Sequence, residues 1–181
     1  CLLDISSGWG DRLIGAIAAD VDFYFGCDPN PDLHAGYQEM IRFFGKDKNK
    51  FKISKSPFEK ANIPNKPYDL IMTSPPYFDI EIYRPDDPQQ SVYQKNLQSW
   101  LHSFMFVALK KAWDKLIVGG YLVLNINNKG NKDRMVEPII YFMNKRSNAD
   151  YYGCISYGEF KGENVRNPQP MWIWRKTHKD L

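Results

Sequence analysis

The stretch 73–77 carries side chains that can contact a ligand. Ser74 has a hydroxyl group, Tyr77 has an aromatic ring, and the two prolines between them stiffen the backbone. Consecutive prolines cannot continue a β-ladder, so the apolar run before them is predicted to be a strand that ends here. In open α/β sheets, ligands bind at the carboxyl ends of the strands. This corner is therefore a candidate ligand contact, and a structural proline turn is the alternative.

A glycine turn near the N-terminus is a second candidate contact. Gly8 and Gly10 separate an apolar run at 1–5 from helical apolar spacing at 11–19. Glycine lets the backbone pass close to a ligand where a Cβ would block it. A strand, a glycine turn and a helix in this order are the context in which a glycine motif indicates a ligand. Without a ligand, the same residues form a tight strand-to-helix turn.

Two further strand ends carry candidate residues. Asp28 follows an apolar run at 22–27, and an acid about 20 residues after a glycine turn is placed to accept hydrogen bonds from ribose hydroxyls. An Asx turn before Pro29 is the alternative. After a third apolar run, Pro57 and Phe58 are predicted to reach the same edge. Phe58 is placed either to lie against an adenine ring or to close the core.

The hydrophobic pattern predicts the elements that position these residues. Gly119 and Gly120 are expected to end a helical segment, and the long connection 78–96 is expected to be a lid or a substrate contact. Strands that alternate with helices, followed by a closing strand pair with a polar connection, indicate a single α/β domain over 1–181. The expected strands are 1–5, 22–27, 51–54, 68–72, 121–126, 151–157 and 171–175, and the expected helices are 11–19, 33–44, 97–112 and 134–144.

The composition is that of a globular protein. The chain has 181 residues, 43% hydrophobic and 25% charged, and its net charge of +3 is compatible with a nucleic-acid partner without requiring one. No apolar run is long enough to span a membrane, and we expect no signal peptide. Its three cysteines have no metal-ligand spacing, so we expect no metal site, and reduced thiols in a cytoplasmic protein. Because it starts at Cys1 inside an apolar run, we expect that an N-terminal segment is missing.

Taken together, these motifs resemble S-adenosylmethionine-dependent DNA methyltransferases that methylate exocyclic amino groups. The resemblance covers nearly the whole chain, and the corner at Ser74 is its most specific part because it follows the fourth predicted strand. The matching segments are Asp4-Ile-Ser-Ser-Gly8-Trp-Gly10, Asp28, Ser74-Pro75-Pro76-Tyr77, Gly119-Gly-Tyr-Leu-Val123 and Pro170-Met-Trp-Ile-Trp-Arg-Lys176.

The resemblance implies a Rossmann-like three-layer α/β sandwich with a seven-stranded mixed sheet whose last strand is antiparallel. It also implies S-adenosylmethionine as the cofactor, although Ser6 stands where the family usually has an aromatic or apolar residue. The implied cofactor contacts are Asp4, Ser6, Gly8, Gly10, Asp28, Pro29, Pro57, Phe58 and Ser74, and the implied catalytic residues are Ser74, Pro75, Pro76 and Tyr77.

The residue types fit methyl transfer to an amine. The amine of a nucleobase is a poor nucleophile because its lone pair is delocalised into the ring. The hydroxyl of Ser74 and the carbonyl of Pro75 can each accept one N–H bond, which would localise the lone pair and orient it. Tyr77 would stack on the base, which must leave a duplex before it can react.

The motif favours cytosine N4 in DNA as the acceptor, because Ser-Pro-Pro-Tyr is more typical of the cytosine enzymes than of the adenine enzymes. Adenine N6 remains an alternative, since a serine hydroxyl can accept from the amine and donate to the ring nitrogen of either base. An RNA base or a protein glutamine amide are further alternatives with the same cofactor. A non-catalytic nucleic-acid-binding module is the non-enzymatic alternative.

Overall fold

The computed structural model describes residues 1–45, 47–78, 83, 96–128, 134–161 and 164–179, and for 159–161 and 164–168 only the backbone. Its elements in chain order are β1 (Leu2–Asp4), α1 (Asp11–Ala18), β2 (Tyr24–Cys27), η1 (Pro31–Leu33), α2 (His34–Phe44), η2 (Lys48–Lys50), β3 (Phe51–Ser54), β4 (Tyr68–Thr73), α3 (Leu97–Trp100), the π-helical η4 (Leu101–Met105), α4 (Phe106–Lys115), β5 (Leu116–Asn125), α5 (Val136–Asn144), β6 (Ala149–Lys161) and β7 (Asn164–Lys176).

The strands form one seven-stranded sheet in the order β3-β2-β1-β4-β5-β7-β6. Strands β1 to β5 are parallel, whereas β7 runs antiparallel to both β5 and β6. This confirms the predicted mixed sheet with an antiparallel last strand. The strand order reverses between β1 and β4, and that reversal is where open α/β sheets bind ligands.

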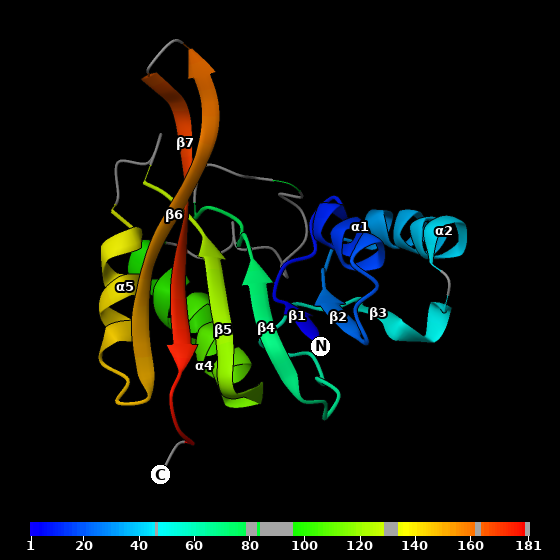
Figure 1. Cartoon of the computed structure of the whole chain (residues 1–181), viewed down its shortest axis with the longest axis horizontal. Coiled ribbons are helices and arrows are strands. Elements are labelled where there is room, and N and C mark those ends of the chain that lie inside the picture. The colour runs from blue at the N-terminus through cyan, green and yellow to red at the C-terminus, as the bar shows by residue number, and fades with distance from the viewer. Residues whose placement is uncertain (46, 79–82, 84–95, 129–133, 162–163, 180–181) are drawn as a thin grey trace.

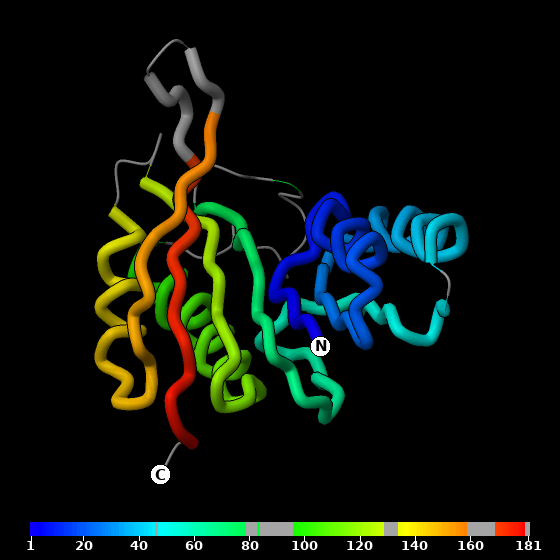
Figure 2. Tube along the Cα trace, viewed as in Figure 1, coloured from blue at the N-terminus to red at the C-terminus, as the bar shows by residue number. Residues whose placement is uncertain are grey.

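Helices cover both faces of the sheet and complete a three-layer α/β sandwich (Figure 1). One core cluster joins α1 and α2 to β1, β2 and β3 through residues such as Leu13, Tyr37 and Ile41. The larger core lies under α4 and α5, where Trp113 and Ile139 are fully buried. Figure 2 follows the chain from its N-terminal half at one end of the sheet to its C-terminal part at the other.

Two boundary predictions were wrong. Helix α4 ends at Lys115, and Gly119 and Gly120 lie inside β5, at a register shift against β4. A Cβ on Gly120 would lie 2.9 Å from the backbone oxygen of Asp69, so a tight backbone approach, and not a helix stop, requires this glycine. The last two strands also extend through the predicted polar connection, so that only residues 162–163 separate them.

The predicted lid at 78–96 falls largely outside the described residues, apart from Phe78, Tyr83 and Asn96. Within the described part of the chain, every helix is too short or too polar to cross a membrane. The same part of the chain has no cluster of three or more His, Cys, Asp or Glu side chains suited to a metal ion.

Candidate functional site

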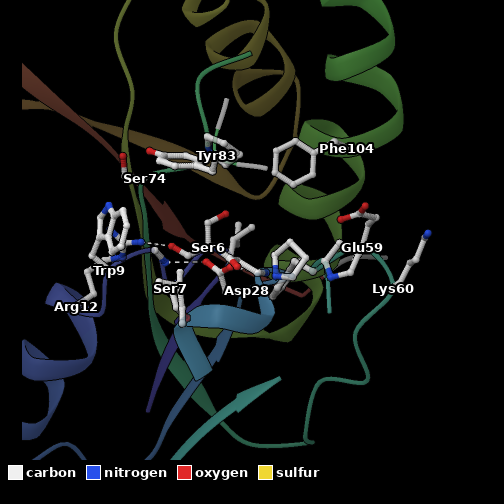
Figure 3. A pocket seen from close by; sticks show the side chains of 18 of the residues that line it. Ser6, Ser7, Trp9, Arg12, Asp28, Glu59, Lys60, Ser74, Tyr83 and Phe104 are labelled. Atoms are coloured by element: carbon white, nitrogen blue, oxygen red, sulfur yellow. Dashed lines mark hydrogen bonds between the residues drawn. The ribbon is translucent and has the colours of Figure 1, made fainter. Parts of the chain in front are cut away.

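A cavity of about 440 Å³ opens at the carboxyl ends of β1, β2, β3 and β4. In Figure 3, Ser74 and Trp9 lie at one end of this cavity, Glu59 and Lys60 lie at the other, and Asp28 lies between them. The described lining comprises Ile5, Ser6, Ser7, Gly8, Trp9, Asp11, Arg12, Asp28, Pro29, Asn30, Leu33, Pro57, Phe58, Glu59, Lys60, Ser74, Pro76, Tyr83, Ser103 and Phe104. We call it the large cavity.

The carboxylate of Asp28 is fixed in the middle of the large cavity. One oxygen accepts a hydrogen bond from the backbone N–H of Gly8 at 3.0 Å, and the other accepts from that of Asn30 at 2.9 Å. Burial raises the pKa of Asp28, and the two backbone N–H groups partly offset this by stabilising the charge. Each carboxylate oxygen has two lone pairs, so both oxygens retain capacity for a ligand hydroxyl.

The two glycines of the turn have different roles. Gly8 has a φ of 56°, lines the large cavity and has open space where a Cβ would stand. Gly10 has a φ of 95° and does not line the cavity. A Cβ on Gly10 would lie 2.8 Å from the sulfur of Met40, so this glycine allows α2 to pack closely against the turn.

Asp4 stabilises the glycine turn from the interior of the protein. Its side chain is fully buried and accepts hydrogen bonds from Arg12 Nε at 2.8 Å, from the hydroxyl of Tyr24 at 3.0 Å and from the backbone N–H of Ser6 at 3.2 Å. Arg12 also donates to the backbone carbonyl of Ser6. Asp4 therefore positions the turn through its neighbours and does not line the large cavity.

The loop after β3 forms the far end of the large cavity. Phe58 lines it but is only 1% exposed and belongs to the main core, which fits the core-closing role better than an open ring platform. Glu59 next to it has a buried Oε2 without a hydrogen-bond partner in the described part of the chain, and burial raises its pKa. Lys111 on α4 holds the loop, because its Nζ donates to the backbone carbonyls of Phe58, Glu59 and Ala61.

The two candidate side chains of the proline corner, Ser74 and Tyr77, are placed differently. Ser74 is partly exposed and lines the large cavity, as does Pro76, while Pro75 is buried. Tyr77 is 9% exposed and points to a second cavity, which Ser74 also lines.

The structure thus places eight of the predicted residues around one cavity and four behind it or beside it. Glu59, Arg12 and Lys111 were not predicted as site residues. Glu59 directly follows the predicted Phe58, and Arg12 lies two residues after Gly10, so their neighbours were the available signals. The eight are Ser6, Gly8, Asp28, Pro29, Pro57, Phe58, Ser74 and Pro76, and the four are Asp4, Gly10, Pro75 and Tyr77.

No protein-family model matches the chain, and no curated protein matches its sequence. Solved structures do match. An rRNA methylase from Streptococcus thermophilus superposes with a TM-score of 0.64 at 11% identity, over 98% of this chain and 86% of that chain. The N-methyltransferase NodS from Bradyrhizobium japonicum gives 0.65 at 12% identity, over 98% and 85%. A Streptococcus mutans protein in complex with SAH gives 0.61 at 13% identity, over 96% and 87%. These likenesses show that the chain has the Rossmann-like methyltransferase fold.

Proposed function

We propose that this chain is an S-adenosylmethionine-dependent methyltransferase that acts on the exocyclic amino group of a nucleobase. The observation that carries this proposal is the large cavity, which brings the glycine turn, Asp28 and Ser74 together at the point where the strand order reverses. The structural neighbours support it, because they include an rRNA methylase, an N-methyltransferase and a protein solved with SAH, the demethylated form of this cofactor.

The lining of the large cavity fits the cofactor. Asp28 has free lone pairs for two ribose hydroxyls, and the open space at Gly8 admits a group close to the backbone. In this proposal the carboxylate of Glu59, which lines the far end of the cavity, accepts a hydrogen bond from the adenine amine. With Glu59 and Ser74 at opposite ends, the adenine would lie near Glu59 and the reactive end near Ser74 (Figure 3).

In this proposal, Ser74 and Pro75 orient the acceptor amine. When bound, the cofactor supplies an electrophilic methyl group on a sulfonium. The hydroxyl of Ser74 and the carbonyl of Pro75 each accept an N–H bond of the amine, so that its lone pair is no longer shared with the ring. Correct orientation of two reactants accounts for a large part of many rate enhancements. No strong base is required, because the amine becomes acidic once it is methylated.

We propose cytosine N4 in DNA as the acceptor, on the resemblance of Ser74-Pro75-Pro76-Tyr77 to the motif of the cytosine enzymes. Adenine N6 fits the same corner and is the first alternative. An RNA base is the second candidate, because rRNA methylases are among the structural neighbours.

Cofactor binding tests the large cavity. Isothermal titration calorimetry with S-adenosylmethionine should show that Asp28→Ala weakens binding by about 1–3 kcal/mol, since charged hydrogen bonds are lost. Asp32→Ala is the matched control, because this aspartate is exposed and does not line the cavity. Equal affinities of the two variants would show that Asp28 does not bind the ribose.

Methyl transfer tests the corner. Ser74→Ala should lower the rate of transfer by about a hundredfold through loss of acceptor orientation, with cofactor affinity retained. Ser156→Ala, an exposed serine on β6 that lines neither cavity, should stay close to the unmodified protein. If both serine variants kept full activity, or if Ser74→Ala lost cofactor binding and folding stability together, the corner would have only a structural role.

A further inference from the structure

A second cavity, of about 510 Å³, adjoins the large cavity at Ser74. Asp11 and Arg12 also line both cavities. The lining of the second cavity is mostly neutral, with two methionines, two tyrosines and several hydroxyl and amide groups, which suits a flat heterocycle better than a phosphate. Its described lining is Asp11, Arg12, Met72, Thr73, Ser74, Tyr77, Asn125, Tyr157, Gln169 and Met171.

Hydrogen bonds join three residues that line this second cavity, Tyr77, Asn125 and Tyr157. Asn125 Nδ2 donates to the hydroxyl of Tyr157 at 3.1 Å. The Oδ1 of the same amide accepts a hydrogen bond from the hydroxyl of Tyr77 at 3.5 Å, which is at the long limit for a hydrogen bond. The amide of Asn125 therefore has its orientation set mainly by Tyr157.

The register of the sheet brings these residues together. Asn125 is the last residue of β5 and pairs with Met171 of β7, which in turn pairs with Ile155 of β6. Beyond that point β6 and β7 continue as a two-stranded hairpin past the end of β5 (Figure 1). Tyr157 lies two residues after Ile155 on β6, and its hydroxyl reaches back to Asn125 at the end of β5.

The direction of the Asn125–Tyr157 bond determines what Tyr157 can offer a ligand. A phenol hydroxyl has one proton to donate and can also accept. Because the hydroxyl of Tyr157 accepts from Asn125, its own proton remains for an acceptor atom in the cavity. Thr73 also lines this cavity, but its Oγ1 is buried, so of these two hydroxyls the one that remains for a ligand is that of Tyr157.

We propose that Tyr157, oriented by Asn125, determines the specificity for the acceptor base by donating a hydrogen bond from its hydroxyl to a ring carbonyl oxygen. This inference rests on the proposed function and deepens it. With the amine held at Ser74, cytosine presents its ring nitrogen and then its O2 along the same edge. Adenine presents a C–H group at the position of O2. A hydrogen-bond donor at this position finds an acceptor in O2 of cytosine and none in the C–H group of adenine. The second cavity therefore favours cytosine.

The experiment pairs a protein variant with a base analogue. Random-sequence duplexes are synthesised with deoxycytidine or with its 2-thio analogue, whose sulfur accepts hydrogen bonds weakly. Transfer of a labelled methyl group gives kcat/KM for each duplex, and nucleoside mass spectrometry identifies the product. The proteins are the unmodified chain, Tyr157→Phe and Tyr152→Phe. Tyr152 is the matched control, because it is an exposed tyrosine of the same strand that does not line the cavity.

For the unmodified chain and for Tyr152→Phe, we expect kcat/KM to be about tenfold lower on the 2-thiocytosine duplex than on the cytosine duplex. This factor corresponds to the loss of about one hydrogen bond. Tyr157→Phe should be about tenfold slower on cytosine and should no longer distinguish the two duplexes, with unchanged affinity for S-adenosylmethionine. If Tyr157→Phe still distinguished them, or if the unmodified chain methylated adenine and not cytosine, the inference would be wrong while the methyltransferase proposal stood. If the unmodified chain methylated neither DNA nor RNA, both would be wrong.

Discussion

Lys111 holds the Glu59 end of the large cavity in place, and replacing this lysine tests the fold around the site. Its Nζ lies 3.1 Å from the carbonyl oxygen of Phe58, 3.1 Å from that of Glu59 and 2.6 Å from that of Ala61. Lys111→Met keeps the length and apolar stem of the side chain but removes all three donors. The loop after β3 would then lose these hydrogen bonds to α4.

The magnitude follows from the three bonds. A hydrogen bond from a charged group contributes about 1.5–3 kcal/mol. Simple addition over three carbonyls overestimates the loss, because one ammonium makes all three bonds and water can reach the freed carbonyls of this half-buried site. We therefore expect Lys111→Met to lower the free energy of unfolding by about 2–4 kcal/mol. Cofactor affinity should fall as well, since Phe58 and Glu59 line the cavity.

Urea denaturation and calorimetry with S-adenosylmethionine measure the two effects. Lys110→Met is the matched control on the same helix, because Lys110 is 64% exposed and pairs only with Asp114 among the contacts described. Such a surface pair contributes about 0.3–0.5 kcal/mol. Equal stability losses in the two variants, or an unchanged cofactor affinity in Lys111→Met, would refute the role of Lys111 in holding the loop.

Two further predictions concern the glycine turn and the proposed ribose contact at Asp28. Burial raises the pKa of Asp28. In the proposal the ribose hydroxyls bind its charged form, so cofactor affinity should decrease on acidification at a pH above the ordinary range of an aspartate. Asp28→Asn should bind weakly with no such pH dependence, as calorimetry at several pH values would show. Gly10→Ala should destabilise the fold by about 1–3 kcal/mol, because an L-residue at a φ of 95° is strained and its Cβ meets Met40. Gly15→Ala, inside α1 with open space at the Cβ, should stabilise it by about 0.4–1 kcal/mol.

Much of the fold could be predicted because hydrophobic periodicity and turn residues agree over β1 to β4. The errors arose where glycine and proline have roles that depend on neighbouring strands. Gly158 accompanies a register shift between β6 and β7, so a residue that usually marks a loop lies within a strand. Pro170 lies in β7 beyond its last pairing with β5, where one side of the strand needs no ladder hydrogen bond.

The site could be predicted in part for a similar reason. Ser74 and Asp28 directly follow strands, and Gly8 lies in the turn after β1. Parallel strands end at a common edge, so local sequence order was sufficient to bring these residues together. Lys111 acts on carbonyls about 50 residues away, and Asn125 meets Tyr157 across β7. These contacts depend on helix orientation and strand register, which no local pattern specifies. Gly10 and Asp4 matched a motif, yet they support the turn from behind instead of lining the cavity.

The central claim is that the corner at Ser74 methylates an exocyclic amine with a methyl group from the cofactor in the large cavity. The most direct measurement is transfer of a labelled methyl group from S-adenosylmethionine to DNA and, in parallel, to RNA, followed by digestion to nucleosides and mass spectrometry. We predict labelled N4-methylcytosine from DNA with the unmodified chain and about a hundredfold less with Ser74→Ala. N6-methyladenine or a methylated RNA base would change the acceptor and keep the mechanism. A chain that binds S-adenosylmethionine but labels neither DNA nor RNA would contradict the claim.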